Sequence, residues 1–436
     1  MIPSSIRRRF GGMTSAVVVR VSGRALAFLL ALVLARELGV EGFGVYSFAT
    51  TWVTLLLVVS GLGYGGLLLR QTAVYVERDQ PELLLGLIQT ARRTIIPLSI
   101  VLVVLAAAAA ALFFDPIFLV PLLIALPTVI VRTFSLVWEG VLRGLGRVDE
   151  SFISTFVVYP LVMLAGVGLL AVLSVDLTPE IALVLFLLSF MAGAVAVWLL
   201  ARRRLRPIIG ATPAAKHPEE GRYSLLLPFT TLTLLGSVSA SLGLITLGLF
   251  DLPDEVGIFQ VARKLTEPIS LIFSVIGMSL AALLASLYAR DGIREARPRI
   301  ARAVRLSLLG ALPIAAILLL APDFVLGLFG QGFEGARASL FILTAASLLD
   351  IASGVALVAL MMTHHQRAAI VAKGIGLTVN LVLCLTLIPA LGASGAAIAL
   401  AADTIATNAL AVVLAWKVLG LNTTAFSLPR RVFGRV

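Results

Sequence analysis

Twelve long apolar stretches dominate the chain, and basic residues gather in every second gap between them. A helix that crosses a bilayer needs about 20 mostly apolar residues. A 60% hydrophobic composition with only 13% charged residues excludes a soluble globular domain. The pattern predicts an all-α polytopic membrane protein with twelve spans, near residues 14–35, 44–69, 94–114, 117–142, 152–174, 181–200, 224–249, 257–287, 304–322, 338–361, 374–390 and 396–416.

The basic residues predict the orientation of these spans, because cytoplasmic loops carry an excess of Lys and Arg. The cations lie mainly in the N-terminal segment, in the gaps 70–93, 143–147, 202–222, 290–305 and 367–373, and in the tail from Lys417. The other gaps are short and mostly acidic. Both termini are therefore expected on the cytoplasmic side of the plasma (inner) membrane. The net charge of +11 follows from this topology and does not indicate a nucleic-acid partner.

The longest polar stretch between spans, 201–223, separates six spans from six. It predicts an N-terminal six-helix lobe (1–200), a cytoplasmic linker (201–223), a C-terminal six-helix lobe (224–416) and a basic tail (417–436). The motif GVYSFA (44–49) follows the first span, and GIFQVA (257–262) follows the seventh, with Glu41 and Glu255 just upstream. Six spans separate the copies, so the lobes are expected to be related by a pseudo-two-fold axis along the membrane normal.

Glycines gather at two predicted hairpins. Gly39 and Gly42 follow the first span, and Gly392 and Gly395 precede the twelfth. Small residues let helices approach closely. The hairpins are either hinges for moving lobes or ordinary tight turns, and the sequence leaves both interpretations open.

Cations at membrane depth are the candidate binding residues, because a charge at a helix centre costs about 2.5–3.5 kcal/mol on insertion scales. Arg24, Arg132 and Lys264 lie in three different spans and are predicted to bind an anionic group, such as a phosphate, in a cavity between the lobes. Arg20 and Arg263 are weaker candidates. Arg20 can instead snorkel to the interface, and Arg263 can pair with a carboxylate one turn away.

A second set of polar residues is predicted to line the cavity or couple transport to an ion: Glu267, Asp350, Asn380, Asp403 and Asn408. Buried carboxylates can bind H⁺ or Na⁺. Alternatively, Asp350 and Asp403 pair with cations on other spans, and Asn380 links helices. The membrane potential acting on a charged substrate is another source of coupling. Glu139, seven residues after Arg132, is either its partner or an interfacial residue.

No resident cofactor or metal is predicted. The chain has one cysteine, Cys384, and three histidines without metal-ligand spacing. It also lacks the glycine-rich Gly-Lys-Ser/Thr loop that binds nucleotide phosphates. The chain is therefore expected to have no ATPase activity of its own, and the short outer gaps add to the expectation that it is not an enzyme.

Four segments resemble a known family at matching points of the topology. They are ARELGVEGFGVYSFA (35–49), VGIFQVARKL (256–265), LFGQGF (328–333) with LFIL (340–343), and IPALGASGAAIAL (388–400). Together they resemble the polysaccharide-biosynthesis flippases, which are the O-antigen and exopolysaccharide lipid-linked repeat-unit exporters of the multidrug/oligosaccharidyl-lipid/polysaccharide exporter superfamily.

This resemblance implies two six-helix lobes, a central cavity and alternating access. It implies that a polyprenyl-pyrophosphate-linked oligosaccharide moves from the cytoplasmic to the outer leaflet, with glycosyltransferases and a glycan polymerase of the same pathway as partners. A cation-coupled multidrug exporter of the same fold is the main alternative, although the cationic residues disfavour it. An integral-membrane glycan polymerase is a further alternative, which the short outer gaps disfavour.

Overall fold

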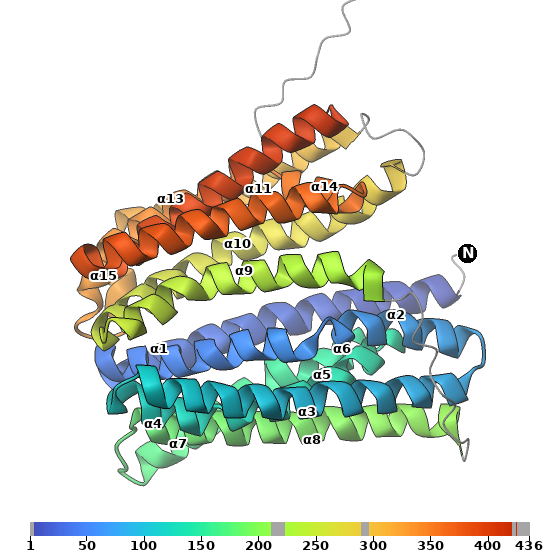
Figure 1. The fold of residues 1–436 in the computed structure, drawn as a ribbon, viewed down its shortest axis with the longest axis horizontal. Helices are drawn as coiled ribbons and strands as arrows, with labels where there is room; N and C mark the ends of the chain where they lie inside the picture. The colour runs from blue at the N-terminus through green and yellow to red at the C-terminus, as the bar shows by residue number, and fades with distance from the viewer. Residues whose placement is uncertain (1–3, 211–222, 289–295, 421–423, 425–436) are drawn as a thin grey trace, which may run out of the picture. The chain divides into compact units, whose positions relative to one another are not determined.

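The computed structural model describes residues 4–210, 223–288, 296–420 and 424, and in these ranges it contains helices and no strand (Figure 1). It does not describe the side chains of residues 4–21, 223–229 and parts of 274–297. The chain divides into two compact units, Met1–Thr230 (unit 1) and Thr231–Val436 (unit 2). The predicted all-α class is confirmed. The predicted linker lies largely in 211–222, outside the described residues.

Unit 1 contains helices that run along a common direction (Figure 1). They are α1 (Ser4–Gly61), α2 (Tyr64–Glu77), α3 (Pro81–Phe113), α4 (Pro116–Ala125), α5 (Pro127–Gly144), α6 (Val148–Ile153), the π-helix η1 (Ser154–Val158), α7 (Tyr159–Val172) and α8 (Pro179–Ile209). Helix α1 is broken at Gly39, whose φ of 68° and ψ of −174° are nearly exclusive to glycine. This break separates the first two predicted spans.

Helix α9 (Tyr223–Leu249) crosses the boundary between the units. Unit 2 continues with α10 (Pro253–Tyr288), α11 (Ala296–Leu320), α12 (Pro322–Gly327), the 3₁₀ helix η3 (Phe333–Ala336), α13 (Arg337–Ser353), α14 (Ala356–Met362) and α15 (Gln366–Leu419). Gly392 breaks α15 with a φ of 52°. The span predicted near 338–361 ends earlier in the structure, because Gly354, with a φ of 80°, separates α13 from α14, and Phe333–Ser353 is long and apolar enough to cross a membrane.

Eight helices of the described residues are long and apolar enough to cross a membrane, and nine if the bent pair formed by α1 and α2 is one span. One of the eight is the 54-residue α15, which contains the break at Gly392. These helices make the chain a multi-pass membrane protein. The number twelve and the pseudo-two-fold axis remain predictions.

Each unit has its own apolar core, and large apolar side chains also cover its outside. In unit 1 the core includes Leu68, Leu84 and Val141, each fully buried. By contrast, Leu112 is 80% exposed and Leu320 of unit 2 is 85% exposed. Helices that are apolar on every side suit lipid, where all backbone hydrogen bonds must be satisfied within the helix.

The break at Gly392 is held by a carboxylate from another helix of unit 2. Glu255, in the first turn of α10, accepts a hydrogen bond at 2.6 Å from the backbone N–H of Ala393. A side chain built at Gly392 would clash with the same carboxylate. Glu255 thus caps the helical segment that restarts after the break, where the helix dipole favours a negative charge.

Replacing Glu255 with alanine is therefore expected to lower the free energy of unfolding by about 0.5–2 kcal/mol, the usual cost of losing a cap. The exposed neighbour Asp254 provides the control, since Asp254→Ala removes a carboxylate from the same turn. Thermal unfolding of the purified variants in one detergent measures the difference. Equal melting temperatures for the two variants would contradict the capping role.

Candidate functional site

The first polar cluster lies in unit 1, around Arg132 of α5. Arg132 Nη1 donates to Glu139 Oε1 at 3.2 Å and to Thr155 Oγ1 at 2.9 Å. Thr155 in turn donates to the same Glu139 oxygen at 3.3 Å. The side chains of Arg132 and Glu139 are only 14% and 15% exposed. Glu139 is thus the partner of Arg132 and does not stand alone at the interface.

An aromatic wall lies against this ion pair. The Arg132 guanidinium lies 4.7 Å from the ring centre of Phe190, and Tyr159 stacks on Phe190 at 4.3 Å with the planes 11° apart. The hydroxyls of Tyr159 and Tyr46 are 3.5 Å apart. Thr155 lies in the π-helix η1, which ends at Val158, immediately before Tyr159. Single π-helical turns inside α-helices are frequent at functional sites.

Arg132 keeps donors free for a ligand. A guanidinium has five N–H donors in a rigid fork, and both bonds from Arg132 to described residues leave from Nη1. Its Nε and Nη2 are therefore not engaged by those residues. A fork of this kind matches two oxygens of a phosphate.

Arg24, another predicted cation of unit 1, does not join this cluster. Arg24 is exposed on α1 and forms no ion pair with the residues that the structure describes. Arg20 lies in the helical part of α1, but its side chain is outside the described residues. Their predicted binding role therefore remains a prediction.

In unit 2, the alternative in which Arg263 pairs with Glu267 is not the arrangement that the structure shows. Lys264 Nζ lies 2.9 Å from Glu267 Oε1, so the carboxylate pairs with the residue three positions before it. Residues three or four positions apart are neighbours on a helix surface. Here Glu267 pairs with Lys264, three positions before it, and not with Arg263, four positions before it. The Arg263 guanidinium instead lies 5.9 Å from the Phe259 ring centre.

Among the side chains that the structure describes, the most buried charged cluster surrounds Asp403 of α15, which is 1% exposed. Lys373 Nζ lies 3.1 Å from Asp403 Oδ1 and 2.9 Å from Oδ2. Thr407 donates to Oδ1 at 3.0 Å, and Ser239 of α9 donates to Oδ2. The ammonium of Lys373 also donates to Ser239 Oγ at 2.9 Å. Of the two interpretations of Asp403, the structure supports the one in which it pairs with a cation.

Two of the remaining predicted residues also link helices. Asn380 Nδ2 donates to the backbone carbonyl of Ser239 at 3.0 Å, and Cys384 donates to Asn380 Oδ1 at 3.3 Å. Asn408 Nδ2 donates to Asp350 Oδ1 at 2.7 Å. Asn380 and Asn408 therefore join helices or helical segments within unit 2.

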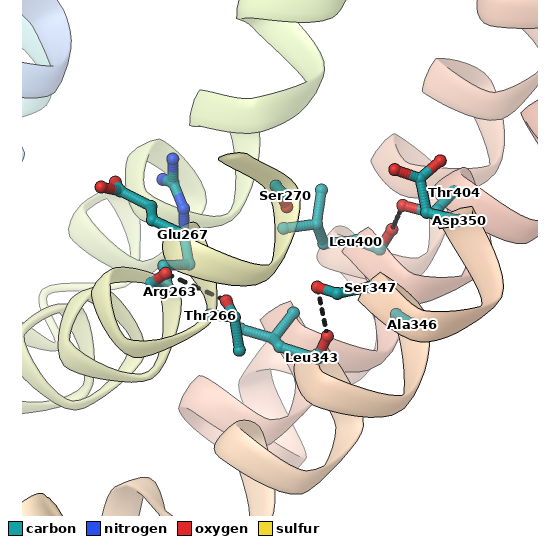
Figure 2. A pocket seen from close by; sticks show the side chains of 10 residues that line it. All are labelled: Arg263, Thr266, Glu267, Ser270, Leu343, Ala346, Ser347, Asp350, Leu400 and Thr404. Atoms are coloured by element: carbon teal, nitrogen blue, oxygen red, sulfur yellow. Dashed lines mark hydrogen bonds between the residues drawn. The ribbon is translucent and has the colours of Figure 1, made fainter. Parts of the chain in front are cut away.

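A cavity of about 220 Å³ lies within unit 2, between α10, α13 and α15. Figure 2 shows Arg263 and Glu267 on one side of it and Asp350 and Thr404 on the other. Its lining is Arg263, Thr266, Glu267, Ser270, Leu343, Ala346, Ser347, Asp350, Leu400 and Thr404. The cavity thus brings together three of the predicted residues: Arg263, Glu267 and Asp350. Among the described residues, no group of three or more His, Cys, Asp or Glu side chains could hold a metal ion.

Sequence reasoning missed Lys373, Thr155 and Ser239. Lys373 is counted above among the cytoplasmic cations of the gap 367–373, but α15 begins at Gln366 and carries Lys373 to the buried Asp403. One sequence signal for Lys373 did exist. Lys373 and Asn380 are seven residues apart, so they share a helix face, and this spacing indicates that Lys373 belongs to the same helix as Asn380. Thr155 and Ser239 are single hydroxyls in apolar runs, and nothing in the sequence distinguishes them.

Solved structures share this fold. An inward-facing multidrug resistance MATE family transporter of the MOP superfamily matches with a TM-score of 0.73 and 15% identity, over 93% of this chain and 98% of that chain. The lipid II flippase MurJ matches with a TM-score of 0.68 and 13% identity, over 91% and 86%. A MOP superfamily transporter from Pyrococcus furiosus matches with a TM-score of 0.60 and 14% identity, over 92% and 91%.

No curated protein matches the sequence. The family model described as polysaccharide biosynthesis protein matches residues 11–283, more than half of the 436 residues. The chain therefore belongs to the polysaccharide biosynthesis protein family.

Proposed function

We propose that this protein is a flippase that moves a polyprenyl-pyrophosphate-linked oligosaccharide from the cytoplasmic to the outer leaflet by alternating access. Family membership supports a role in polysaccharide synthesis. The MOP fold, shared with transporters, supports movement of a substrate across the membrane. Both are compatible with a lipid-linked intermediate, because glycan chains are too polar to cross a bilayer alone.

The observation that carries the proposal is the free side of Arg132. This cation is 14% exposed in an apolar unit, is held by Glu139 and Thr155, and rests on Phe190. Its unengaged Nε and Nη2 are suited to a pyrophosphate oxygen pair. Arg24, Lys264 and, more weakly, Arg20 and Arg263 are proposed to contribute further positive charge toward the head group.

Transport in proteoliposomes tests the proposal. A fluorescent polyprenyl-pyrophosphate oligosaccharide in the donor leaflet is expected to reach the opposite leaflet only in vesicles that contain the protein. A phosphatidylcholine with the same fluorophore is the matched control and is expected to stay in place. Equal movement of both lipids, or of neither, would overturn the assignment.

One observation favours a second candidate function, a cation-coupled multidrug exporter. The unit 2 cavity carries two carboxylates, Glu267 and Asp350, against one cation, Arg263. An acidic lining attracts cationic compounds. Efflux of a cationic dye from the same proteoliposomes, without movement of the lipid-linked oligosaccharide, would favour this candidate.

A further inference from the structure

Most of the polar groups that line the unit 2 cavity present hydrogen-bond acceptors to it. Thr266 donates its hydroxyl hydrogen to the carbonyls of Ala262 and Arg263, at 3.3 and 3.0 Å. Ser347 donates to Leu343 O at 2.8 Å, and Thr404 donates to Leu400 O at 3.0 Å. Each hydroxyl has one hydrogen and two lone pairs. These three hydroxyls have therefore used their donors within their own helices and present acceptors to the cavity.

The two carboxylates add to the acceptors. Asp350 uses Oδ1 for Asn408, and Glu267 uses Oε1 for Lys264. The described residues leave the second oxygen of each carboxylate unengaged. Against these acceptors stand two donor groups, the guanidinium of Arg263 and the hydroxyl of Ser270. A ligand that fits this lining must supply several hydrogen-bond donors and at least one acceptor.

This requirement excludes phosphate and disfavours a bare cation. Phosphate oxygens are acceptors and would be repelled by Glu267 and Asp350. A metal ion needs several oxygens within about 2.3–2.6 Å of one point, whereas these acceptors come from three helices around about 220 Å³. The positive charge of Arg263 in the same lining opposes a cation further.

We propose that this cavity is a sugar site that binds one residue of the transported oligosaccharide. Sugar hydroxyls donate to the acceptors, ring and hydroxyl oxygens accept from Arg263, and Leu343, Ala346 and Leu400 pack against the carbon face of the ring. The cavity is smaller than the roughly 300–1,000 Å³ of sites for drug-sized ligands, so it takes a single sugar residue. The inference rests on the proposed function, because the sugar belongs to the flipped lipid.

Binding of neutral methyl glycosides tests this site without the lipid. The full-length protein in nanodiscs is titrated with methyl glucoside, methyl galactoside and methyl N-acetylglucosaminide, and saturation-transfer NMR measures occupancy. At least one glycoside is expected to bind. Thr404→Val is expected to weaken that binding by about 3- to 10-fold, the usual effect of losing one hydrogen bond.

The chain offers a matched control in Thr378→Val. Thr378 lies on the same helix and makes the same bond to the carbonyl four residues back, at 3.0 Å, but it is exposed and outside the cavity. Its substitution is expected to leave glycoside binding unchanged. A second variant, Ser347→Leu, is expected to fill the cavity and abolish binding, with the melting temperature of each variant confirming that it folds.

Three results would overturn the sugar site: no glycoside binds at any concentration, Thr404→Val and Thr378→Val bind equally, or Na⁺ raises the melting temperature while glycosides do not. Each of these results would refute the sugar site alone. The proposed function is tested separately by the flippase assay and would stand if that assay succeeds. Failure of the flippase assay with glycoside binding intact would remove the transport role and not the site.

Discussion

Replacing Lys373 with methionine is expected to lower the free energy of unfolding of unit 2 by about 3–5 kcal/mol, the cost of removing one partner of a buried ion pair. The methionine retains most of the side-chain volume and loses the charge. Asp403, 1% exposed, would then keep only the hydroxyls of Ser239 and Thr407. Unfolding in a titration of sodium dodecyl sulfate, followed by tryptophan fluorescence, measures the loss.

Two further variants separate the ion pair from side-chain size and surface charge. Lys417→Met removes an exposed lysine from the last turn of the same helix and is expected to change stability little. The double variant Lys373→Met with Asp403→Leu is expected to recover most of the loss, because an apolar pair avoids the unpaired charge. A double variant as unstable as the single one would refute the ion-pair explanation.

The same geometry bears on ion coupling. Four hydrogen bonds reach the two oxygens of Asp403, two from Lys373 and one each from Ser239 and Thr407. A sodium ion or proton bound there would have to displace the ammonium. Asp403 is therefore a poor candidate for a coupling residue. Asp350 makes one bond, to Asn408, and keeps an oxygen facing the cavity.

The sequence predicts the fold class and most helix positions because a membrane restricts the backbone conformations that a chain can adopt. An apolar run of about 20 residues in lipid satisfies its backbone only as a helix. The breaks at Gly39 and Gly392 also lie where glycines gather at predicted hairpins. Gly354 differs, because it is an isolated glycine within an apolar run, where a helix usually tolerates it.

The candidate site was harder to predict because its contacts are distant in sequence. The pair of Arg132 and Glu139 lies on one helix, and the spacing of seven indicates it. The partners Lys373 and Asp403 are 30 residues apart on two segments that turn back at Gly392. A lysine near the end of an apolar run has the pattern of an interfacial residue, so only the packing of the helices identifies its role.

Replacing Arg132 with lysine is expected to reduce transport of the lipid-linked oligosaccharide by about 10- to 100-fold while changing stability little. Lysine can keep the ion pair with Glu139, but it loses the planar fork and the stacking on Phe190. A charged hydrogen bond contributes about 1.5–3 kcal/mol, which corresponds to the expected range. Initial rates of flipping in proteoliposomes, together with melting temperatures, separate binding from folding.

Arg92→Lys is the matched control. Arg92 is an exposed arginine of α3, and its guanidinium also lies near an aromatic ring, 6.0 Å from the ring centre of Trp138 of α5. It is expected to transport at the wild-type rate. Arg132→Gln is expected to lose both transport and stability, because it also leaves Glu139 without its cation. Wild-type transport by Arg132→Lys would show that Arg132 serves the helix packing of unit 1 alone, and the phosphate contact would then have to come from other cations.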